Sequence, residues 1–247
     1  MHDRKDGLRE GIARGMSQAC VYCYEAQKTM LQVYGTVPKM PPVQFIQVMS
    51  RGLVESVITS GVVFGSYFSV YNHMGMANPF AGPIATLATS IIKTPISNSM
   101  RILQAGLAPN LVQATTKIIK AKSVGGLYSG YRTSIVEDMI EIDLRVRTYK
   151  ILRETLATHT NVSPSLALGI GALSGMVTAW ITTPFDTIRA HMAVDATSQT
   201  KNIGPIAQAT KLIKKGGVRQ LYNGATIRAV SNGVKSALFY MFFEMLQ

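Results

Sequence analysis

Two long runs without a charged residue constrain this chain more than any other feature. No Asp, Glu, Lys or Arg occurs in the 37 residues from Ser56 to Ile92 or in the 31 residues from Thr155 to Phe185. A helix needs about 20 mostly apolar residues to cross a bilayer. The first run is broken at 75–79 (GMANP), so it predicts two spans, near 53–74 and 80–104. The second run predicts a span over its apolar stretch at 166–183. A membrane protein is therefore expected.

The charged residues support this expectation. They make up only 15% of the 247 residues, and 25 Lys and Arg against 13 Asp and Glu give a net charge of +12. Nucleic-acid binders gather such bases in clusters with interleaved aromatic residues. Here the bases are spread over predicted loops and span ends, so no nucleic-acid partner is expected. Residues 1–10 are polar and of mixed charge, so no secretory signal peptide is expected, and any organelle address would lie within the mature fold.

A short charged motif recurs three times, each time at the end of an apolar, small-residue-rich stretch. Its complete form is Pro-x-acid-x-x-base, at 184–189 (PFDTIR). The copy at 95–101 (PISNSMR) lacks the acid and has its base one position late, and the copy at 23–28 (CYEAQK) lacks the proline. A proline inside a helix removes a backbone hydrogen bond and kinks the helix. Helix kinks are therefore predicted at Pro95 and Pro184, and a weaker bend where Cys23 stands in the first copy.

A second landmark follows each motif, namely a glycine with an aromatic residue 19 positions later. The three pairs are Gly52 with Tyr71, Gly130 with Tyr149, and Gly224 with Phe243. The approaches to the last two glycines, QATTKIIK from 113 and QATKLIKK from 208, have apolar residues at helical spacing with lysines opposite. They are predicted to be short amphipathic helices at the membrane surface. The first repeat is the shortest, and its surface helix is expected to be nearly lost.

Three units of helix, surface helix and helix resemble the mitochondrial carrier family, and the resemblance covers nearly the whole chain. It implies an all-α membrane protein with six transmembrane helices in three pseudo-symmetric repeats, at 1–76, 77–158 and 159–247. It further implies a multi-pass monomer in the mitochondrial inner membrane, surrounded by membrane lipids, cardiolipin among them. The shortness of the chain marks it as a divergent, shortened member.

In the family, the acid of one odd-numbered helix pairs with the base of the next and closes the matrix side. Carried over, this implies a complete pair between Asp186 and Lys28 and a weaker one between Glu25 and Arg101. Ser97 leaves Arg189 without an acid. Ionisable groups at membrane depth are costly unless they are paired. The implied matrix gate consists of Glu25, Lys28, Gln32, Ser97, Arg101, Gln104, Asp186 and Arg189, in which the two glutamines resemble those that brace the pairs.

The opposite, cytosolic gate is eroded. Its acid positions hold Asn72, Lys150 and Glu244, and of its base positions only Arg153 keeps a base. A single hydrogen bond between Asn72 and Arg153 is the best replacement, and such a bond is worth about 1 kcal/mol. We therefore expect a carrier that closes poorly on the cytosolic side, or a relative of carriers that no longer transports.

The family's solute contacts lie seven residues after each landmark glycine, at Thr59, Glu137 and Ser231. Asp138 directly follows Glu137, and Glu141 and Arg145 continue the second contact along the same helix face at spacings of four. Arg228 and Lys235 share a face of the last helix. Two adjacent acids in a membrane cavity favour a cation or a zwitterion. Alternatively, the acids pair with Arg132, Arg145 or Arg147 and are structural.

The expected function is transport of a small metabolite by alternating access, with a cationic or zwitterionic substrate such as S-adenosylmethionine or an amino acid. A nucleotide or deoxynucleotide is the first alternative, with phosphates bound by Arg14, Lys28, Arg228 and Lys235. A non-transporting membrane adaptor is the second. The sequence has no phosphate-binding glycine loop and no paired-carboxylate pattern, so an enzyme is not expected. Cys20 and Cys23 have neither a thioredoxin-like context nor further zinc ligands, so no metal or other cofactor is expected.

Overall fold

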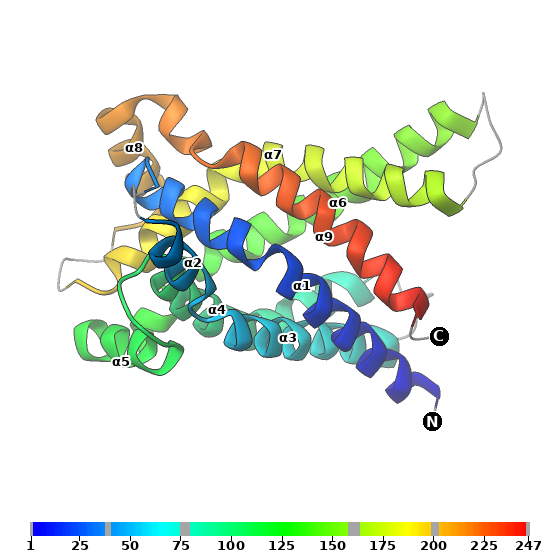
Figure 1. Cartoon of the computed structure of the whole chain (residues 1–247), viewed down its shortest axis with the longest axis horizontal. Helices are drawn as coiled ribbons and strands as arrows, with labels where there is room; N and C mark the ends of the chain where they lie inside the picture. The colour runs from blue at the N-terminus through cyan, green and yellow to red at the C-terminus, as the bar shows by residue number, and fades with distance from the viewer. Residues whose placement is uncertain (1, 38–40, 75–79, 158–163, 199–202, 246–247) are drawn as a thin grey trace.

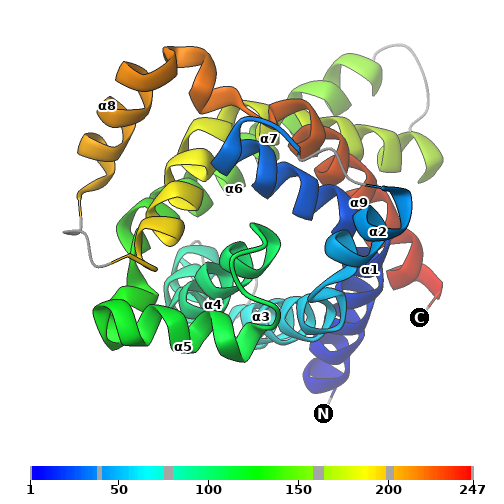
Figure 2. The same ribbon diagram turned by 60° about the vertical axis from the view of Figure 1, so that its left-hand side comes forward.

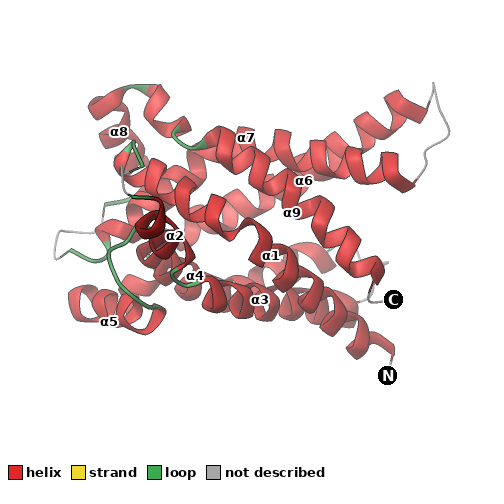
Figure 3. Ribbon diagram, viewed as in Figure 1, coloured by secondary structure: helices red, strands yellow, loops and turns green. Residues whose placement is uncertain are grey.

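A computed structural model describes the chain except for residues 1, 38–40, 75–79, 158–163, 199–202 and 246–247. All regular structure in the described residues is helical (Figures 1 and 3). The α-helices are α1 (His2–Tyr34), α2 (Pro42–Ser50), α3 (Leu53–Met74), α4 (Ala81–Gln104), α5 (Leu111–Lys122), α6 (Tyr131–Ala157), α7 (Pro164–Asp195), α8 (Pro205–Gly216) and α9 (Ala225–Met245). Two 3-10 turns, η1 (Val124–Tyr128) and η2 (Val218–Tyr222), precede α6 and α9.

The six long helices form a closed ring. Each of α1, α3, α4, α6, α7 and α9 packs against the next in this order, and α9 packs back against α1 (Figure 2). The short helices α2, α5 and α8 lie at one end of the ring, and both chain ends lie at the other (Figure 1). The predicted spans near 53–74 and 80–104 correspond closely to α3 and α4, and the two predicted amphipathic segments form α5 and α8.

The first surface helix was expected to be nearly lost, and this expectation is wrong. Residues Pro42–Ser50 form α2, with nine residues against twelve in each of α5 and α8. Pro41 and Pro42 stand where the helix begins, and a proline there leaves no hydrogen bond unmade within the helix. The missing residues of the first repeat therefore shorten this helix and its connections without removing it.

Two segments are long and apolar enough to cross a membrane, Phe45–Met74 and Leu168–Asp195, judged over the described part of the chain. The most apolar window of the first is only 6% buried inside the protein. The other long helices do not meet the same combined criteria of length, hydropathy and charge over the described residues. Six membrane spans in three repeats therefore remain a prediction for this chain.

The three landmark glycines occupy matching positions in the fold. Gly52, Gly130 and Gly224 directly precede α3, α6 and α9, and their φ angles are 83°, 75° and 78°. Residues with a Cβ atom rarely adopt this left-handed conformation. Each landmark glycine therefore marks the turn at which the chain enters a long helix. The preceding segment is a short connection before α3 and a 3-10 turn before α6 and α9.

Small residues set the spacing between neighbouring helices. A Cβ atom added to Gly61 of α3 would lie 3.1 Å from the carbonyl oxygen of Gly11 on α1, and one added to Gly175 of α7 would lie 3.1 Å from Ser236 Oγ on α9. Such close approach of backbones is typical of helix packing in membranes. Pro95 and Pro184 lie inside α4 and α7, as the predicted kinks require, and both helices continue past them.

Candidate solute-binding site and gate

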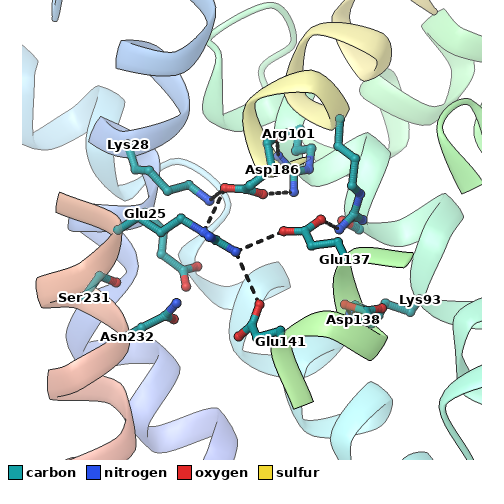
Figure 4. A pocket seen from close by; sticks show the side chains of 13 residues that line it. Glu25, Lys28, Lys93, Arg101, Glu137, Asp138, Glu141, Asp186, Ser231 and Asn232 are labelled. Carbon is teal, nitrogen blue, oxygen red and sulfur yellow. Dashed lines mark hydrogen bonds and ion pairs between the residues drawn. The ribbon is translucent and has the colours of Figure 1, made fainter. Parts of the chain in front are cut away.

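A cavity of about 170 Å³ lies inside the ring, between α1, α4, α6, α7 and α9. Five carboxylates and five bases line it together with three neutral polar side chains (Figure 4). The lining residues are Glu25, Lys28, Lys93, Ser97, Arg101, Glu137, Asp138, Glu141, Asp186, Arg189, Arg228, Ser231 and Asn232. The charges of the lining therefore balance.

Asp186 is the most heavily bonded carboxylate of the cavity. Its Oδ2 atom accepts from Lys28 Nζ at 2.8 Å and from Gln32 Nε2 at 2.9 Å, and Arg228 Nε lies 3.1 Å away. Its Oδ1 atom accepts from Arg101 at 2.5 Å. The side chain of Asp186 is only 3% exposed, so these partners replace its hydration. The motifs at the ends of α1, α4 and α7 therefore meet at this one carboxylate.

Glu137 lies between two arginines. Arg189 NH1 donates to Oε2 at 2.7 Å, and Arg228 NH2 donates to Oε1 at 2.9 Å. The NH2 group of Arg228 also contacts Glu141 Oε2 at 3.3 Å, and its NH1 group donates to Thr182 Oγ1 at 2.7 Å. Arg228 thus joins acids of α6 and α7 from its position on α9.

Glu25 is bonded to α9 and not to α4. It forms an ion pair with Lys235 and accepts from Gln18 Nε2 at 2.5 Å, and Gln18 in turn donates to Ser56 Oγ at 2.8 Å. The expected pair of Glu25 with Arg101 is absent from the described contacts, because Arg101, displaced by one residue from the motif's base position, reaches Asp186 instead.

The two glutamines of the motif differ in their contacts. Gln32 braces the Lys28–Asp186 pair by donating to the same Oδ2 atom that accepts from Lys28. Gln104 accepts from Thr29 Oγ1 at 2.9 Å and so joins α4 to α1 without touching an ion pair. Ser97 lies 3.4 Å from Arg189 NH2, which is a weak contact for a buried cation. The missing acid at Ser97 is thus replaced by Glu137 from the neighbouring helix α6.

The remaining acids of α6 are also paired. Asp138 accepts from Lys93 Nζ at 2.7 Å, and Glu141 accepts from Arg145 NH2 at 2.9 Å. Of the partners that the sequence suggested for Glu137, Asp138 and Glu141, only Arg145 is used, and only by Glu141. Arg147 pairs with Asp143 on the outer part of α6 instead.

The two uncharged residues among the predicted solute contacts, Ser231 and Thr59, take no part in the ion pairs. Ser231 lines the cavity, is 2% exposed and has no hydrogen-bond partner for its Oγ atom. Thr59 is not among the lining residues, and its hydroxyl donates to the carbonyl oxygen of Glu55 in its own helix. Of the three family contact positions, the structure therefore places Glu137 and Ser231 at the cavity and Thr59 outside it.

The residues of the predicted cytosolic gate lie apart from this network. Lys150 and Arg153 are exposed and Asn72 is partly exposed, and none of the three makes a hydrogen bond or ion pair in the described part of the chain. The side chain of Glu244 lies outside the described residues. The suggested hydrogen bond between Asn72 and Arg153 is not formed.

Three residues of the site were missed in the sequence. Lys93 and Asn232 line the cavity, and Gln18 holds Glu25. A signal for Lys93 was available, because it is the first charged residue after the run of 37 and lies within a predicted span. A base at membrane depth is a functional candidate by default. Gln18 and Asn232 carry no comparable signal.

Comparisons with known proteins agree with this geometry. The sequence profile of the family described as mitochondrial carrier protein matches residues 161–247. An uncharacterized mitochondrial carrier of Schizosaccharomyces pombe is 24% identical over 98% of this chain and 93% of its own length. A chloroplast protein of Arabidopsis thaliana, named as a probable S-adenosylmethionine carrier, is 25% identical over 95% of this chain and 71% of its own length. Human mitoferrin-1 is 20% identical over 98% of this chain and 81% of its own length.

The last third of the chain matches the mitochondrial carrier family, and relatives named as carriers align with nearly the whole length of the chain. Its relatives are named as carriers and transporters, and several of their names give a mitochondrial or chloroplast location. These similarities support a transporter of the carrier type, and the substrate is a separate question.

Proposed function

We propose that this chain carries a small zwitterionic amino compound across the mitochondrial inner membrane by alternating access, with S-adenosylmethionine as the leading candidate. The observation that carries the proposal is the pairing inside the cavity. Glu137 and Glu141 each lie within 3.3 Å of Arg228, and every carboxylate of the lining has a base as its partner.

This pairing favours a substrate that carries both signs of charge. A bare cation or a bare anion would bind one half of a pair and leave the other half buried without a partner, which costs several kcal/mol. A zwitterion replaces both halves, because its carboxylate takes the arginine and its cationic group takes the acid. The unpartnered hydroxyl of Ser231 offers one further hydrogen bond at the same place.

The names of relatives support an amino compound. Two Arabidopsis thaliana relatives are named as S-adenosylmethionine carriers, and an Aspergillus clavatus relative is named as a mitochondrial glycine transporter. Others are named for citrate and for nicotinamide adenine dinucleotide, so the family name alone does not select the substrate. The balanced charges of the cavity favour the amino compounds over the multiply charged anions.

The ion pairs also suggest how access alternates. In the three-repeat arrangement that we propose, the bonds of Asp186 to α1, α4 and α9 close the end at which the surface helices lie. At the opposite end, Asn72, Lys150 and Arg153 make no such bond in the described part of the chain. This is the arrangement expected of a carrier that is closed on the matrix side and open on the cytosolic side, and breaking the Asp186 bonds would reverse it.

Uptake into liposomes tests the proposal. The purified protein should take up labelled S-adenosylmethionine saturably, and the compound should raise its thermal stability, because a ligand of the folded state stabilises it by mass action. Glu141→Gln should lower uptake, since Glu141 faces Arg228 in the cavity. Asp143→Asn is the matched control, because this exposed acid of the same helix pairs only with Arg147. Equal uptake by the two variants would contradict the site.

The same assay decides between the alternatives. Stabilisation and uptake of a nucleotide, without any effect of amino compounds, would replace the proposed substrate by a phosphate-bearing one. A protein that no solute stabilises and that transports none would instead be an adaptor on a carrier fold. The unpaired Asn72, Lys150 and Arg153 are the observation that favours this last function over transport of any solute, because alternating access needs a gate at each end.

A further inference from the structure

Three side chains from three helices meet outside the charged cavity, toward the end of the ring at which both chain ends lie. The guanidinium carbon of Arg14 on α1 lies 5.1 Å from the ring centre of Phe64 on α3. The ring of Phe64 lies 5.2 Å from that of Phe239 on α9, centre to centre, with an angle of 73° between the planes. We call these three residues the Arg14–aromatic cluster.

The cluster faces the interior of the ring. Helix α1 lies between α3 and α9, so rings from these two helices meet across one side of α1. Arg14 precedes the cavity residue Glu25 by 11 positions, which is about three helical turns and returns to the same face. Phe239 follows Lys235 by one turn, and Lys235 reaches Glu25 inside the ring. Arg14 and Phe239 thus lie on the same helix faces as Glu25 and Lys235, which meet inside the ring.

The cluster is open to a ligand. Arg14, Phe64 and Phe239 are all partly exposed. In the described part of the chain the guanidinium of Arg14 makes no hydrogen bond or ion pair, and its observed partner is the face of Phe64. A cation at membrane depth normally faces a partner or a water-filled cavity. The other face of the Arg14 guanidinium and its N–H groups can therefore contact a ligand.

The distance between the Arg14–aromatic cluster and the charged cavity fits a molecule with two different recognition groups, one at each end. Ser231 at the cavity and Phe239 in the cluster are eight residues apart on α9, which is about 12 Å along the helix axis. A free amino acid is too short to touch both places. A nucleoside joined to an amino acid is long enough, and guanidinium planes and aromatic rings are the groups on which nucleobases stack.

We infer that the Arg14–aromatic cluster binds the flat purine ring of the substrate, while the amino-acid end lies among Glu137, Glu141 and Arg228. This inference rests on the proposed function and extends it, because it selects adenosyl compounds over simple amino acids. Phe64, Phe239 and Arg14 then determine specificity, whereas the ion pairs bind the part that both kinds of substrate share.

Competition between two inhibitors tests the inference. Uptake of labelled S-adenosylmethionine is measured in liposomes against unlabelled S-adenosylmethionine and against S-methylmethionine, which keeps the amino acid and the sulfonium but lacks the adenosyl group. The wild type should prefer the adenosyl compound by about tenfold, in keeping with the strength of base stacking on one aromatic side chain. Phe64→Leu and Phe239→Leu should each reduce this preference severalfold and leave inhibition by S-methylmethionine unchanged. The ratio within one variant does not depend on how much protein is folded.

Phe68→Leu is the matched control. Phe68 lies one turn further along α3, and its ring contacts are with Phe64, Tyr67 and Tyr71 of the same helix. It should keep the wild-type preference, and Arg14→Lys, which keeps the charge but loses the plane, should lower it. An unchanged preference in Phe64→Leu and Phe239→Leu would overturn the role of the cluster and leave the proposed function standing. If neither compound binds the wild type, the proposed function fails and the cluster inference fails with it.

Discussion

Arg189 of α7 donates to Glu137 of α6 at 2.7 Å, although the two residues are 52 positions apart and belong to different motifs. Arg189 is the base of the motif at the end of an odd-numbered helix, and Glu137 is a predicted solute contact. Because one ion pair joins them, a substrate that takes Glu137 also removes the partner of Arg189. Solute binding and opening are thus joined at a single pair of side chains in the mechanism that we propose.

Restoring the missing acid should separate these two roles. In Ser97→Asp the new carboxylate would lie beside Arg189, whose NH2 group is already 3.4 Å from Ser97 Oγ. Arg189 would then be held on α4, so the closed end should become more stable and turnover slower. A gain of about 1 kcal/mol raises the midpoint of thermal unfolding by about 2–4 °C in a chain of this size. Ser97→Asn, which adds similar volume without charge, should show neither effect. Faster transport by Ser97→Asp would contradict this role of Arg189.

Asp186 should be the acid whose loss destabilises the fold most. Asp186→Asn removes the common partner of Lys28, Arg101 and Arg228. Removal of one member of a buried ion pair typically costs about 3–5 kcal/mol, because the other charge stays buried without a partner. Thermal unfolding in detergent should therefore shift downward by many degrees. Asp195→Asn, in the last turn of the same helix, removes only a partly exposed pair with Lys211 at 3.5 Å and should change stability by less than about 1 kcal/mol.

Two glycine substitutions should have opposite signs. The Cβ atom of Gly61→Ala would lie 3.1 Å from the backbone oxygen of Gly11, so α1 and α3 would have to separate and the protein should lose stability. No atom lies within 4 Å of a Cβ atom built at Gly169 in α7. Gly169→Ala should therefore raise stability by up to about 1 kcal/mol through helix propensity. Both shifts can be read from thermal unfolding, and a loss at Gly169 equal to that at Gly61 would refute the packing argument.

The two cysteines should be dispensable. Cys20 and Cys23 are free and exposed, and the described residues contain no group of three or more potential metal ligands. The variant Cys20→Ser/Cys23→Ser should therefore keep wild-type uptake and thermal stability, and chelators should not inhibit either protein. A loss of uptake in the double variant with unchanged stability would show that the thiols take part in function.

Much of the helical architecture could be predicted from the sequence, because apolar runs and glycines act locally. The bounds of α3 and α4 follow from the interruption of one charge-free run. The turns at Gly130 and Gly224 follow from the similar amphipathic segments that precede these two glycines in the sequence. The pair of Lys28 and Asp186 was also predictable, since both residues occupy the expected motif positions.

The other ion pairs could not be predicted, because they depend on the rotation of helices about their axes. A shift of one position turns a side chain by 100°, and this is why Arg101 reaches Asp186 and not Glu25. Lys235 lies in α9 and Glu137 in α6, the second long helices of their repeats, whose motifs the sequence assigns to solute contacts and not to closure. Their pairing with Glu25 and Arg189 became visible only when all six long helices were placed together.

The pairing of Glu25 with Lys235 has a consequence for the making of the protein. The two residues are separated by 210 positions in the sequence, and Lys28 and Asp186 are separated by 158. During synthesis and insertion, α1 therefore enters its environment before Glu25 and Lys28 have their ion-pair partners on α9 and α7. The last helix supplies both Lys235 and Arg228, so a chain that stops before α9 leaves Glu25 and Glu137 short of a cation. The ring therefore closes only when α9, the last helix, has been added. Truncation before α9 should prevent assembly of the whole ring, which is more than the loss of one helix.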